Sequence, residues 1–509
     1  MCEAVVRSIF VVAAVLTPSI HMNGNSFLER RWVLLILVAL VFRAAYVFYH
    51  IRESEPVIRI GEFAIYTGDT ESYLLPVENY IEHGSYKPDY RLPGVGVPYW
   101  LFRQVMGPRA SRDALVVFQW LLSGISVYLL ALITLRWSGS MRAAWAVYGL
   151  FVLSAYSSWF DPAISSDSLS VTVLILQVWV MQLAIDRQRI WLVILAGLLM
   201  AWLVFLRPVD AALVLPAAYL VFRYWKGLRR FRTALLFVLP FAMIDGAWTV
   251  RNWRVNGQFN PLTNEGVMPV YVTDGRWWEV MKFMQCWGGD YIWWNPGTTM
   301  RWFGVWKGGG ALDDEGRKAQ PPPPYAYVSA YNEDSLRSVA DDVRRLADET
   351  LSRADSSTVA ASIATRLQRY SEAYKQGAPF NYHVMSRLRM LKNELSQNGT
   401  ESLVIKPFSS MAIWEKGWKL MQVAIFLFSL VAGCAAMLFM RWMPQKEGTT
   451  FRQWVPWFTA FTILIYPLVF RMCEWRYLVM VFPLLLMMGV ILVMGPVERR
   501  FSKKQAADV

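Results

Sequence analysis

Residues 190–206 read "IWLVILAGLLMAWLVFL", seventeen consecutive positions without a charged side chain. As an α-helix this stretch would be about 26 Å long, close to the ~30 Å thickness of the hydrocarbon core of a bilayer. Arg189 precedes it and Arg207 follows it, so charged side chains stand at both ends. The stretch therefore predicts a membrane-spanning helix.

Other parts of the chain share this pattern of a long apolar run with few or no charges. The further runs are 32–49, 114–135, 143–160, 167–185, 209–224, 233–250, 417–440, 455–470 and 477–495. Composition agrees, since 55% of the residues are hydrophobic and 25 are Trp, more apolar than a soluble protein of this size requires. The sequence predicts an all-α polytopic membrane protein with about ten transmembrane helices, in a range of nine to twelve because several runs are short.

The formal net charge of +13 raises the question of nucleic-acid binding. If Arg30 and Arg31 hold the N-terminus in the cytoplasm, ten spans assign every later loop to one side. The short cytoplasmic segments then carry eighteen Lys and Arg residues, and the short outer loops carry only Arg207, Arg471 and Arg476. This is the positive-inside bias. It predicts a multi-pass protein of the bacterial inner (plasma) membrane, with both termini cytoplasmic and no nucleic-acid partner.

The spans divide the chain into two membrane modules around a large insertion. We expect residues 22–250 to hold seven spans and a first extracytoplasmic loop at 53–112, and residues 416–509 to hold three spans and a basic cytoplasmic tail. Residues 1–21 resemble a weak signal sequence, and Met22 is an alternative start, so we expect no structural role for this segment.

The insertion at 251–415 is predicted to be an extracytoplasmic domain, mixed or mostly helical. Its first part, 251–320, is rich in Trp and Gly, and its second part, 330–400, has apolar residues at the spacing of amphipathic helices. Three apolar faces are expected: Leu336, Val339, Val343 and Leu346; Val359, Ile363, Leu367 and Tyr370; Val384, Leu388, Leu391 and Leu395. The Trp cluster at 277–306 fits an interfacial aromatic belt, or a surface on which a sugar stacks.

The four cysteines, Cys2, Cys286, Cys434 and Cys473, show no paired spacing. They indicate neither a disulfide framework nor a zinc site, and we predict no metal ligands. Cys286 and Cys473 both fall on the outer side, so a pair between these two stays open.

Ionisable residues gather at the outer ends of the predicted spans. They are Asp69, Glu71, Glu78, Glu82, His83, Asp89, Arg91, Asp161, Asp167, Arg207, Asp210, Asp245, Arg251, Arg254, Arg471, Glu474 and Arg476. Charges at membrane depth are costly and tend to face cavities or partners, although an Arg at a span end can simply snorkel to lipid phosphates. Arginine clamps phosphate bidentately, and a carboxylate can accept a proton from a hydroxyl. Together they suit group transfer from a lipid phosphate to a hydroxyl acceptor.

Several short motifs occur in one order around these charges. They are "GDTESY" after the first span, "HGSY", "RLPG", "FLRPVD" at the end of a middle span, "WTVRNWRVNGQFNPLT" where the insertion begins, and "EWRY" before the last span. In this order the chain resembles the GT-C superfamily of membrane glycosyltransferases. The similarity is to the polyprenyl-phosphate-sugar-dependent group, glycosyltransferase family 39-like, that includes protein O-mannosyltransferases and the lipid A aminoarabinose transferase.

The resemblance implies a glycosyltransferase that moves a sugar from a polyprenyl phosphate to a hydroxyl acceptor on the extracytoplasmic face, with inversion. It implies that Asp69 is the catalytic base and that Arg207, Arg251 and Arg476 bind the donor phosphate. For Arg91 of "RLPG" two roles stay open, holding the loop and contacting the donor phosphate. Secondary candidates are Glu71, Asp167, Glu474 and Arg471. Asp69 also reads as an N-cap of the helix that begins at "TESY", which is compatible with catalysis. Glu78 and Glu82 are expected on the polar face of that helix.

The chain also departs from the family's pattern. Thr70 separates Asp69 from Glu71 where relatives carry an adjacent Asp-Glu pair, and Asp167 stands where Glu is frequent. Because some relatives use a divalent metal and others do not, a metal cofactor stays open. Three other functions stay open too: a polysaccharide polymerase or ligase with a pyrophosphate-linked donor, a transporter or flippase of a lipid-linked anion, and a non-enzymatic assembly subunit.

Overall fold

The computed structural model describes residues 31–54, 56–262, 275–289, 298–304, 319–346, 351–396, 408–439, 454–474 and 476–507. Helices dominate this part of the chain, and its extended pairing is confined to isolated bridges such as Ile65 with Ala163. Five helices are long and apolar enough to cross a membrane: α3 Trp32–Glu53, α6 Pro108–Ser138, α9 Ser166–Arg187, α12 Arg229–Asn256 and α19 Ile413–Phe439. The predicted class, an all-α membrane protein, is confirmed.

Further helices coincide with the other predicted spans. They are α7 Met141–Leu153 with α8 Ala155–Ser158, α10 Ile190–Leu206, η2 Pro208–Leu213 with α11 Val214–Tyr224, α20 Trp454–Leu464 with the π-helix η10 Ile465–Phe470, and α21 Arg476–Val479 with α22 Phe482–Ala507. Helix α10 coincides with the predicted stretch because Arg189 and Arg207 bound its apolar run. Each predicted span thus lies on one helix or on two consecutive ones.

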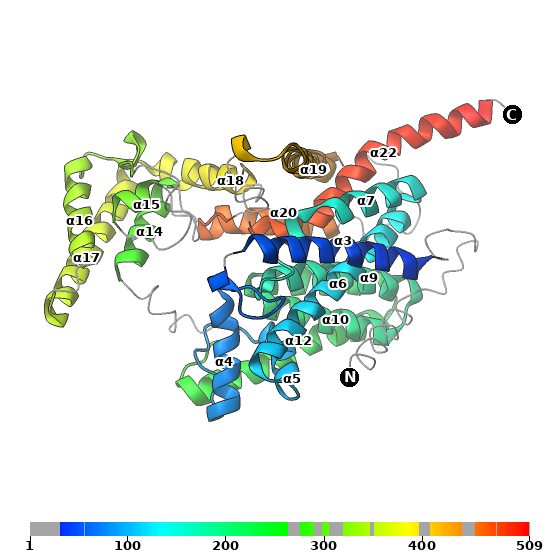
Figure 1. Cartoon of the computed structure of the whole chain (residues 1–509), viewed down its shortest axis with the longest axis horizontal. Coiled ribbons are helices and arrows are strands. Elements are labelled where there is room, and N and C mark those ends of the chain that lie inside the picture. The colour runs from blue at the N-terminus through cyan, green and yellow to red at the C-terminus, as the bar shows by residue number, and fades with distance from the viewer. Residues whose placement is uncertain are drawn as a thin grey trace.

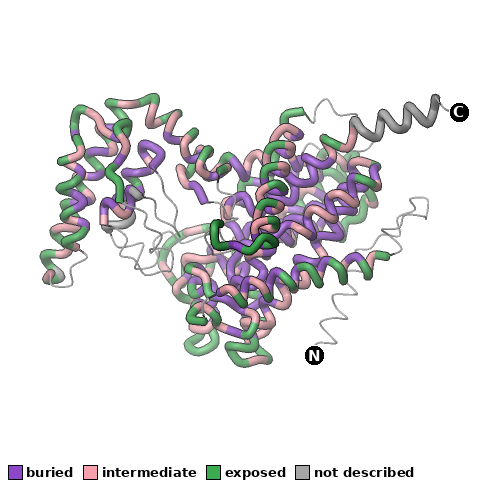
Figure 2. Tube along the Cα trace, turned by 45° about the horizontal axis from the view of Figure 1, so that its top comes forward, coloured by how far each residue is buried: buried purple, intermediate pink, exposed green. Residues whose placement is uncertain are grey.

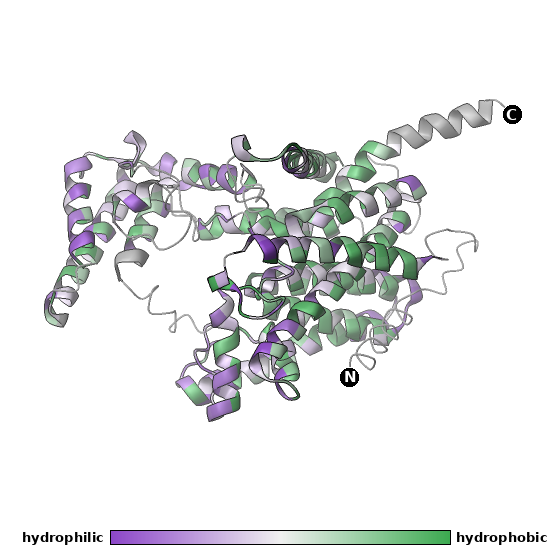
Figure 3. Cartoon of the chain, in the orientation of Figure 1, coloured by the Kyte–Doolittle hydropathy of each residue, from purple (hydrophilic) through white to green (hydrophobic). Residues whose placement is uncertain are grey.

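Helix α9 is the centre of the membrane part. Its residues from Ser166 to Ile185 are all buried, because α6 and α10 pack against it. Helix α3 covers α6, while α12 covers α10 and is itself largely exposed. Figure 1 shows these helices side by side in one body, Figure 2 shows the buried centre, and Figure 3 shows how apolar residues dominate this body.

The helix that begins at Met141 is broken at Ser154, in the middle of a predicted span. The carbonyl of Leu153 accepts hydrogen bonds from Tyr46 Oη (2.6 Å) and from Gln422 Nε2 (2.8 Å). The backbone N–H of Ala155 donates to Gln422 Oε1 (2.9 Å). Side chains from α3 and α19 therefore satisfy the backbone groups that the break exposes.

The connection between α3 and α6 holds two further helices, α4 Thr70–His83 and α5 Gly96–Arg103. Helix α4 ends where expected, because Gly84 takes the left-handed conformation at φ 67°. Glu78 is not on a polar face as predicted. Its side chain is 17% exposed and accepts hydrogen bonds from Arg103, which fixes α4 against α5.

The insertion at 251–415 contains α14 Gly275–Trp287, α15 Thr298–Trp302, α16 Glu333–Leu346, α17 Arg353–Gly377, the π-helix η5 Asn381–Met385 and α18 Ser386–Ser396. Figure 1 shows α14, α15, α16 and α17 beyond one end of the membrane body, with α18 closer to it. Helices α14 to α17 share a hydrophobic core of their own, whereas Leu391 and Leu395 of α18 pack against the core of the membrane body. Trp287 and Trp302 are buried in this core, so these two neither form a belt nor offer a stacking surface. Residues 290–297 and 305–306 of the predicted Trp cluster lie outside the described residues.

Two of the three predicted apolar faces in the insertion are confirmed, and the third is only partly right, because Leu391 and Leu395 pack against the main core while Val384 and Leu388 are exposed. Leu336 on α16 and Ile363 on α17 are buried as predicted. On the third face, Leu388 is 48% exposed, and the buried stripe of α18 is instead Ser386, Met390 and Glu394. This polar-looking stripe is buried because α18 packs against η10 and α21, so the helix is not a free amphipathic surface.

Candidate active site

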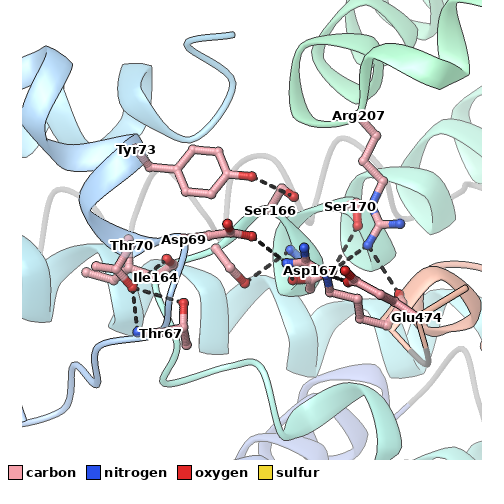
Figure 4. A network of polar contacts seen from close by, with 12 residues as sticks. Thr67, Asp69, Thr70, Tyr73, Ile164, Ser166, Asp167, Ser170, Arg207 and Glu474 are labelled. Carbon is pink, nitrogen blue, oxygen red and sulfur yellow. Dashed lines mark hydrogen bonds and ion pairs between the residues drawn. The ribbon is translucent and has the colours of Figure 1, made fainter. Parts of the chain in front are cut away.

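Asp69 is held in place by the segment that leads into α9. The backbone N–H of Ile65 donates to the carbonyl of Pro162 (3.0 Å), and Thr70 Oγ1 donates to the carbonyl of Ile164 (3.1 Å). One turn further, Tyr73 Oη donates to Ser166 Oγ at 3.1 Å. The start of α4 is thereby fixed against the start of α9 (Figure 4).

Asp69 is at the N-cap position of α4, but its side chain makes no capping hydrogen bond. Its Oδ1 accepts from Arg91 Nη2 at 2.6 Å, and its Oδ2 accepts from Arg476 Nη1 at 2.5 Å. Its side chain is only 12% exposed. The carboxylate is thus engaged by two guanidinium groups in place of the helix end.

Two other carboxylates complete this arrangement. Asp167, on the first turn of α9, accepts from Arg207 Nη2 at 2.5 Å and lies 3.9 Å from Arg476 Nη1. Glu474 accepts from Arg476 Nε. The labelled side chains of Asp69, Asp167, Arg207 and Glu474 converge in Figure 4.

We call these six residues the ion-pair cluster: Asp69, Asp167, Glu474, Arg91, Arg207 and Arg476. Three guanidinium groups balance three carboxylates. Burial by itself raises the pKa of Asp69, but Arg91 and Arg476 outweigh it and hold that pKa below its usual range. Burial raises the pKa of Glu474 to about 7, because its single close cation, Arg476, is shared with the other carboxylates.

The cluster also contains hydrogen-bond donors without acceptors. Arg91 Nε and Arg207 Nε are buried, and neither has a hydrogen-bond partner within the described structure. Buried polar groups in native proteins nearly always have partners. These two donors, at the edge of a group of guanidinium side chains, suit an anion with several acceptor oxygens.

The "RLPG" turn positions Arg91. The carbonyl of Gly94 accepts from Trp202 Nε1 of α10 at 2.9 Å. Gly94 lies so close to the end of α10 that an added Cβ would be 2.4 Å from the carbonyl oxygen of Phe205. Only glycine allows this approach, which brings Arg91 and Arg207 from separate segments to one cluster.

Arg251, at the C-terminal end of α12, does not join the ion-pair cluster. It pairs with Asp89, whose side chain is 1% exposed, and donates to the carbonyl of Tyr86. It lines a cavity of about 390 Å³ between α4, α5 and α12, together with aromatic residues such as Trp100 and Trp248. The cavity is bounded by mainly apolar side chains.

The other secondary candidates lie away from the cluster. Glu71 is exposed, 3.5 Å from Tyr66 Oη. Arg471 lies over the ring of Tyr382 of the insertion at 3.8 Å from the ring centroid. Asp245 accepts from the backbone N–H of Leu262. These residues have local structural contacts, and only Asp167 and Glu474 of the secondary set belong to the cluster.

Among the described residues, the sequence analysis missed several buried ionisable side chains, and Arg43 and Glu394 are two of the most deeply buried of them. Arg43, inside α3, is fully buried and donates to the carbonyl of Phe151 at 3.1 Å. The signal for Arg43 was a charge in the middle of an apolar run. Glu394, on α18, is also fully buried. It gave no signal, because a glutamate in an amphipathic helix normally faces water.

No group of three or more His, Cys, Asp or Glu residues that could hold a metal ion occurs among the described residues. In the same part of the chain, Cys286 and Cys473 form no disulfide with each other. The metal and the cysteine pair that the sequence left open therefore gain no support from the geometry.

Comparison with known proteins leaves the family resemblance untested. No protein-family model matches the chain, and no curated protein matches it either.

Proposed function

We propose that the chain is a membrane glycosyltransferase of the GT-C type with about ten transmembrane helices. It transfers a sugar from a polyprenyl phosphate to a hydroxyl acceptor on the extracytoplasmic face, with inversion. The positive-inside bias supports this placement, because it puts the loops that carry the cluster on the outer side.

The observation that carries the proposal is the ion-pair cluster with its unused donors. Arg91 Nε and Arg207 Nε are buried without acceptors, beside a carboxylate that could accept a proton. A phosphate would supply acceptor oxygens to both guanidinium groups. The same site then holds a leaving group and a base, which is what glycosyl transfer from a phosphate requires.

In the proposed step, the acceptor hydroxyl loses its proton to a carboxylate oxygen of Asp69. The acceptor oxygen forms a bond to the anomeric carbon of the sugar from the face opposite the phosphate. The bond between that carbon and the phosphate oxygen breaks, and its electron pair stays on the departing phosphate. Arg91, Arg207 and Arg476 stabilise the charge that develops there.

Without a donor, Asp69 is a weak base, because Arg91 and Arg476 hold its pKa below the usual range despite its burial. A phosphate bound to the same guanidinium groups would neutralise part of their charge and raise the pKa of Asp69. The base would therefore become effective only when the donor is in place. Before the donor binds, Asp69 therefore does not take up a proton.

The cavity beside Arg251 supports a lipid-linked donor. It offers apolar side chains next to a guanidinium group, the combination that an isoprenoid chain with a phosphate needs. Arg251 is bound to Asp89, and Asp69 is bound to Arg91. Asp89 and Arg91 are two residues apart, and each residue of an extended chain spans at most about 3.6 Å, so their Cα atoms lie within about 7 Å of each other. This short segment links the cavity at Arg251 to the ion-pair cluster.

The test is transfer by the purified full-length protein in nanodiscs. Radiolabelled polyprenyl-phosphate sugar is supplied with an extract of membranes as the acceptor source. We expect label to pass to an acceptor, and Asp69→Asn to abolish transfer while the protein still folds and elutes as a single species in size-exclusion chromatography. The matched control is Glu82→Gln on the same helix, an exposed residue that lies 3.7 Å from His83 Nε2 and outside the ion-pair cluster.

Two outcomes would refute the proposal. One is undiminished transfer by Asp69→Asn. The other is transfer only from a pyrophosphate-linked oligosaccharide, which would instead identify a polymerase or ligase.

A further inference from the structure

A buried carboxyl of the insertion faces the cluster from outside. Glu394 lies on α18, in the stripe that also buries Met390, and its exposed fraction is 0%. Neither of its carboxyl oxygens has a hydrogen-bond partner within the described part of the chain. A carboxylate buried in this way is very costly unless it is neutral or paired with a cation.

Among the described residues, Glu394 forms no ion pair with a cation. Glu474 acts on it electrostatically and carries the same charge type. The phenol groups of Tyr156 and Tyr466, from α8 and η10, also lie within its electrostatic reach. Within the cluster, Arg476 is already shared by Asp69 and Glu474.

The balance of charges in the ion-pair cluster also favours a neutral Glu394. The cluster is balanced at three guanidinium groups and three carboxylates without Glu394. An ionised Glu394 would add an uncompensated negative charge in a buried place, whereas a neutral acid adds none. Burial, and then the neighbouring Glu474, raise the pKa of Glu394 well above its usual range. Burial and the charge balance of the cluster therefore both favour the neutral acid form of Glu394.

Glu474 has one carboxyl oxygen to spare. Its Oε2 accepts from Arg476, while its Oε1 is buried without a hydrogen-bond partner. The acid proton of Glu394 is the donor that such an oxygen lacks, either directly or across one buried water. Two carboxyls in this relation share one proton and carry one negative charge between them.

We propose that Glu394 is a positioning residue, a neutral acid of the insertion that shares its proton with Glu474 and so holds Glu474 on Arg476 and Arg476 on Asp69. The activity part of this inference rests on the proposed glycosyl transfer. The inference that Glu394 shares its proton with Glu474 does not depend on glycosyl transfer.

Other contacts hold the same segment in place from the side of the insertion. Arg387 Nε of α18 donates to the carbonyl of Leu468 at 2.7 Å. The guanidinium group of Arg471 lies over the ring of Tyr382. Helices α18 and η5 thus contact Leu468 and Arg471, and Glu394 lies within electrostatic reach of Glu474 in the same segment.

The experiment compares Glu394→Gln, Glu394→Leu and the packing control Met390→Leu in full-length protein. Gln keeps a donor but cannot ionise, and Leu removes the donor. We expect Glu394→Gln and Met390→Leu to keep the wild-type kcat at pH 7. We expect Glu394→Leu to lose roughly tenfold or more in kcat, the effect of a hydrogen bond to a charged group.

A pH profile separates positioning from a purely structural role. Wild-type kcat should fall on the alkaline side as Glu394 ionises, and Glu394→Gln should lack that fall. Wild-type kcat in Glu394→Leu, or an unchanged alkaline fall in Glu394→Gln, would overturn the inference.

Infrared spectroscopy tests the proton without any substrate. The carbonyl stretch of a protonated carboxylic acid should be present in the wild type at pH 7 and missing in Glu394→Gln. No difference between the two spectra would refute the neutral acid, whatever the enzyme assay shows. A difference together with no transfer from any donor would support the shared proton and refute only the glycosyltransferase.

Discussion

At the scale of single residues, Arg476 does the most in the cluster. It contacts Asp69 and Glu474 directly and lies 3.9 Å from Asp167, and its side chain is 14% exposed. Removal of this one cation would leave these carboxylates buried with too little positive charge. The cost of a buried ion pair appears mainly when one partner is lost.

We therefore expect Arg476→Met to lower the free energy of unfolding by about 3–5 kcal/mol, the usual effect of breaking a buried pair. Thermal or denaturant unfolding in detergent measures it. The control is Arg109→Met. Arg109 pairs with Glu62, but these side chains are 69% and 71% exposed, so a change of at most about 1 kcal/mol is expected. Equal effects in the two variants would argue against a buried cluster.

The pKa of Asp69 predicts a dependence on pH. A carboxyl whose pKa is lowered on folding stabilises the protein above its unfolded pKa, near 3.8, and this contribution is lost as pH falls through the folded pKa. The stability of the wild type should therefore drop below about pH 4 more steeply than that of Asp69→Asn. Unfolding temperatures measured from pH 7 to pH 3 give the two slopes. Parallel slopes would mean that Asp69 is not ion-paired.

At the scale of elements, the "RLPG" turn decides where Arg91 lies. Gly94→Ala would place a Cβ 2.4 Å from the Phe205 carbonyl oxygen, so the turn has to move away from α10. We expect a loss of roughly 1–3 kcal/mol in stability and a higher KM for the donor. Gly107→Ala is the control, because its Cβ would meet nothing within 4 Å. A wild-type KM in Gly94→Ala would show that the turn does not set the donor site.

Helices were predictable from the sequence because long apolar runs with charged ends have one simple solution in a bilayer. The buried face of α18 was not predictable in this way. Leu388 and Leu391 suggested an apolar face, yet the buried stripe includes Glu394, since burial depends on what packs against a helix. No local sequence pattern predicts the ion-pair cluster, because Asp69 and Arg476 are 407 positions apart in the chain. Charge placement and family resemblance suggested both residues, and only the fold brings them into contact.

At the scale of the whole molecule, the ten-span topology remains a prediction that can be tested directly. In a variant without native cysteines, a cysteine at His83 should react with a membrane-impermeant maleimide from outside intact cells. A cysteine at Lys226 should react only after the membrane is opened. Both positions are exposed, so accessibility reports the side of the membrane rather than burial. Labelling of Lys226→Cys in intact cells would show that the topology is the inverse of the predicted one and that the cluster lies on the cytoplasmic side.

The break at Ser154 has a consequence for biogenesis. Helix α3 is synthesised before the break, and its Tyr46 can bond the Leu153 carbonyl as soon as both segments are in the membrane. Gln422, the partner of the Ala155 N–H, is synthesised more than 260 residues later. Until α19 arrives, that N–H needs a temporary partner in lipid, such as water, a lipid head group or an insertion chaperone. Chains truncated before residue 413 should therefore be substrates for membrane quality control, even though their first helices are complete.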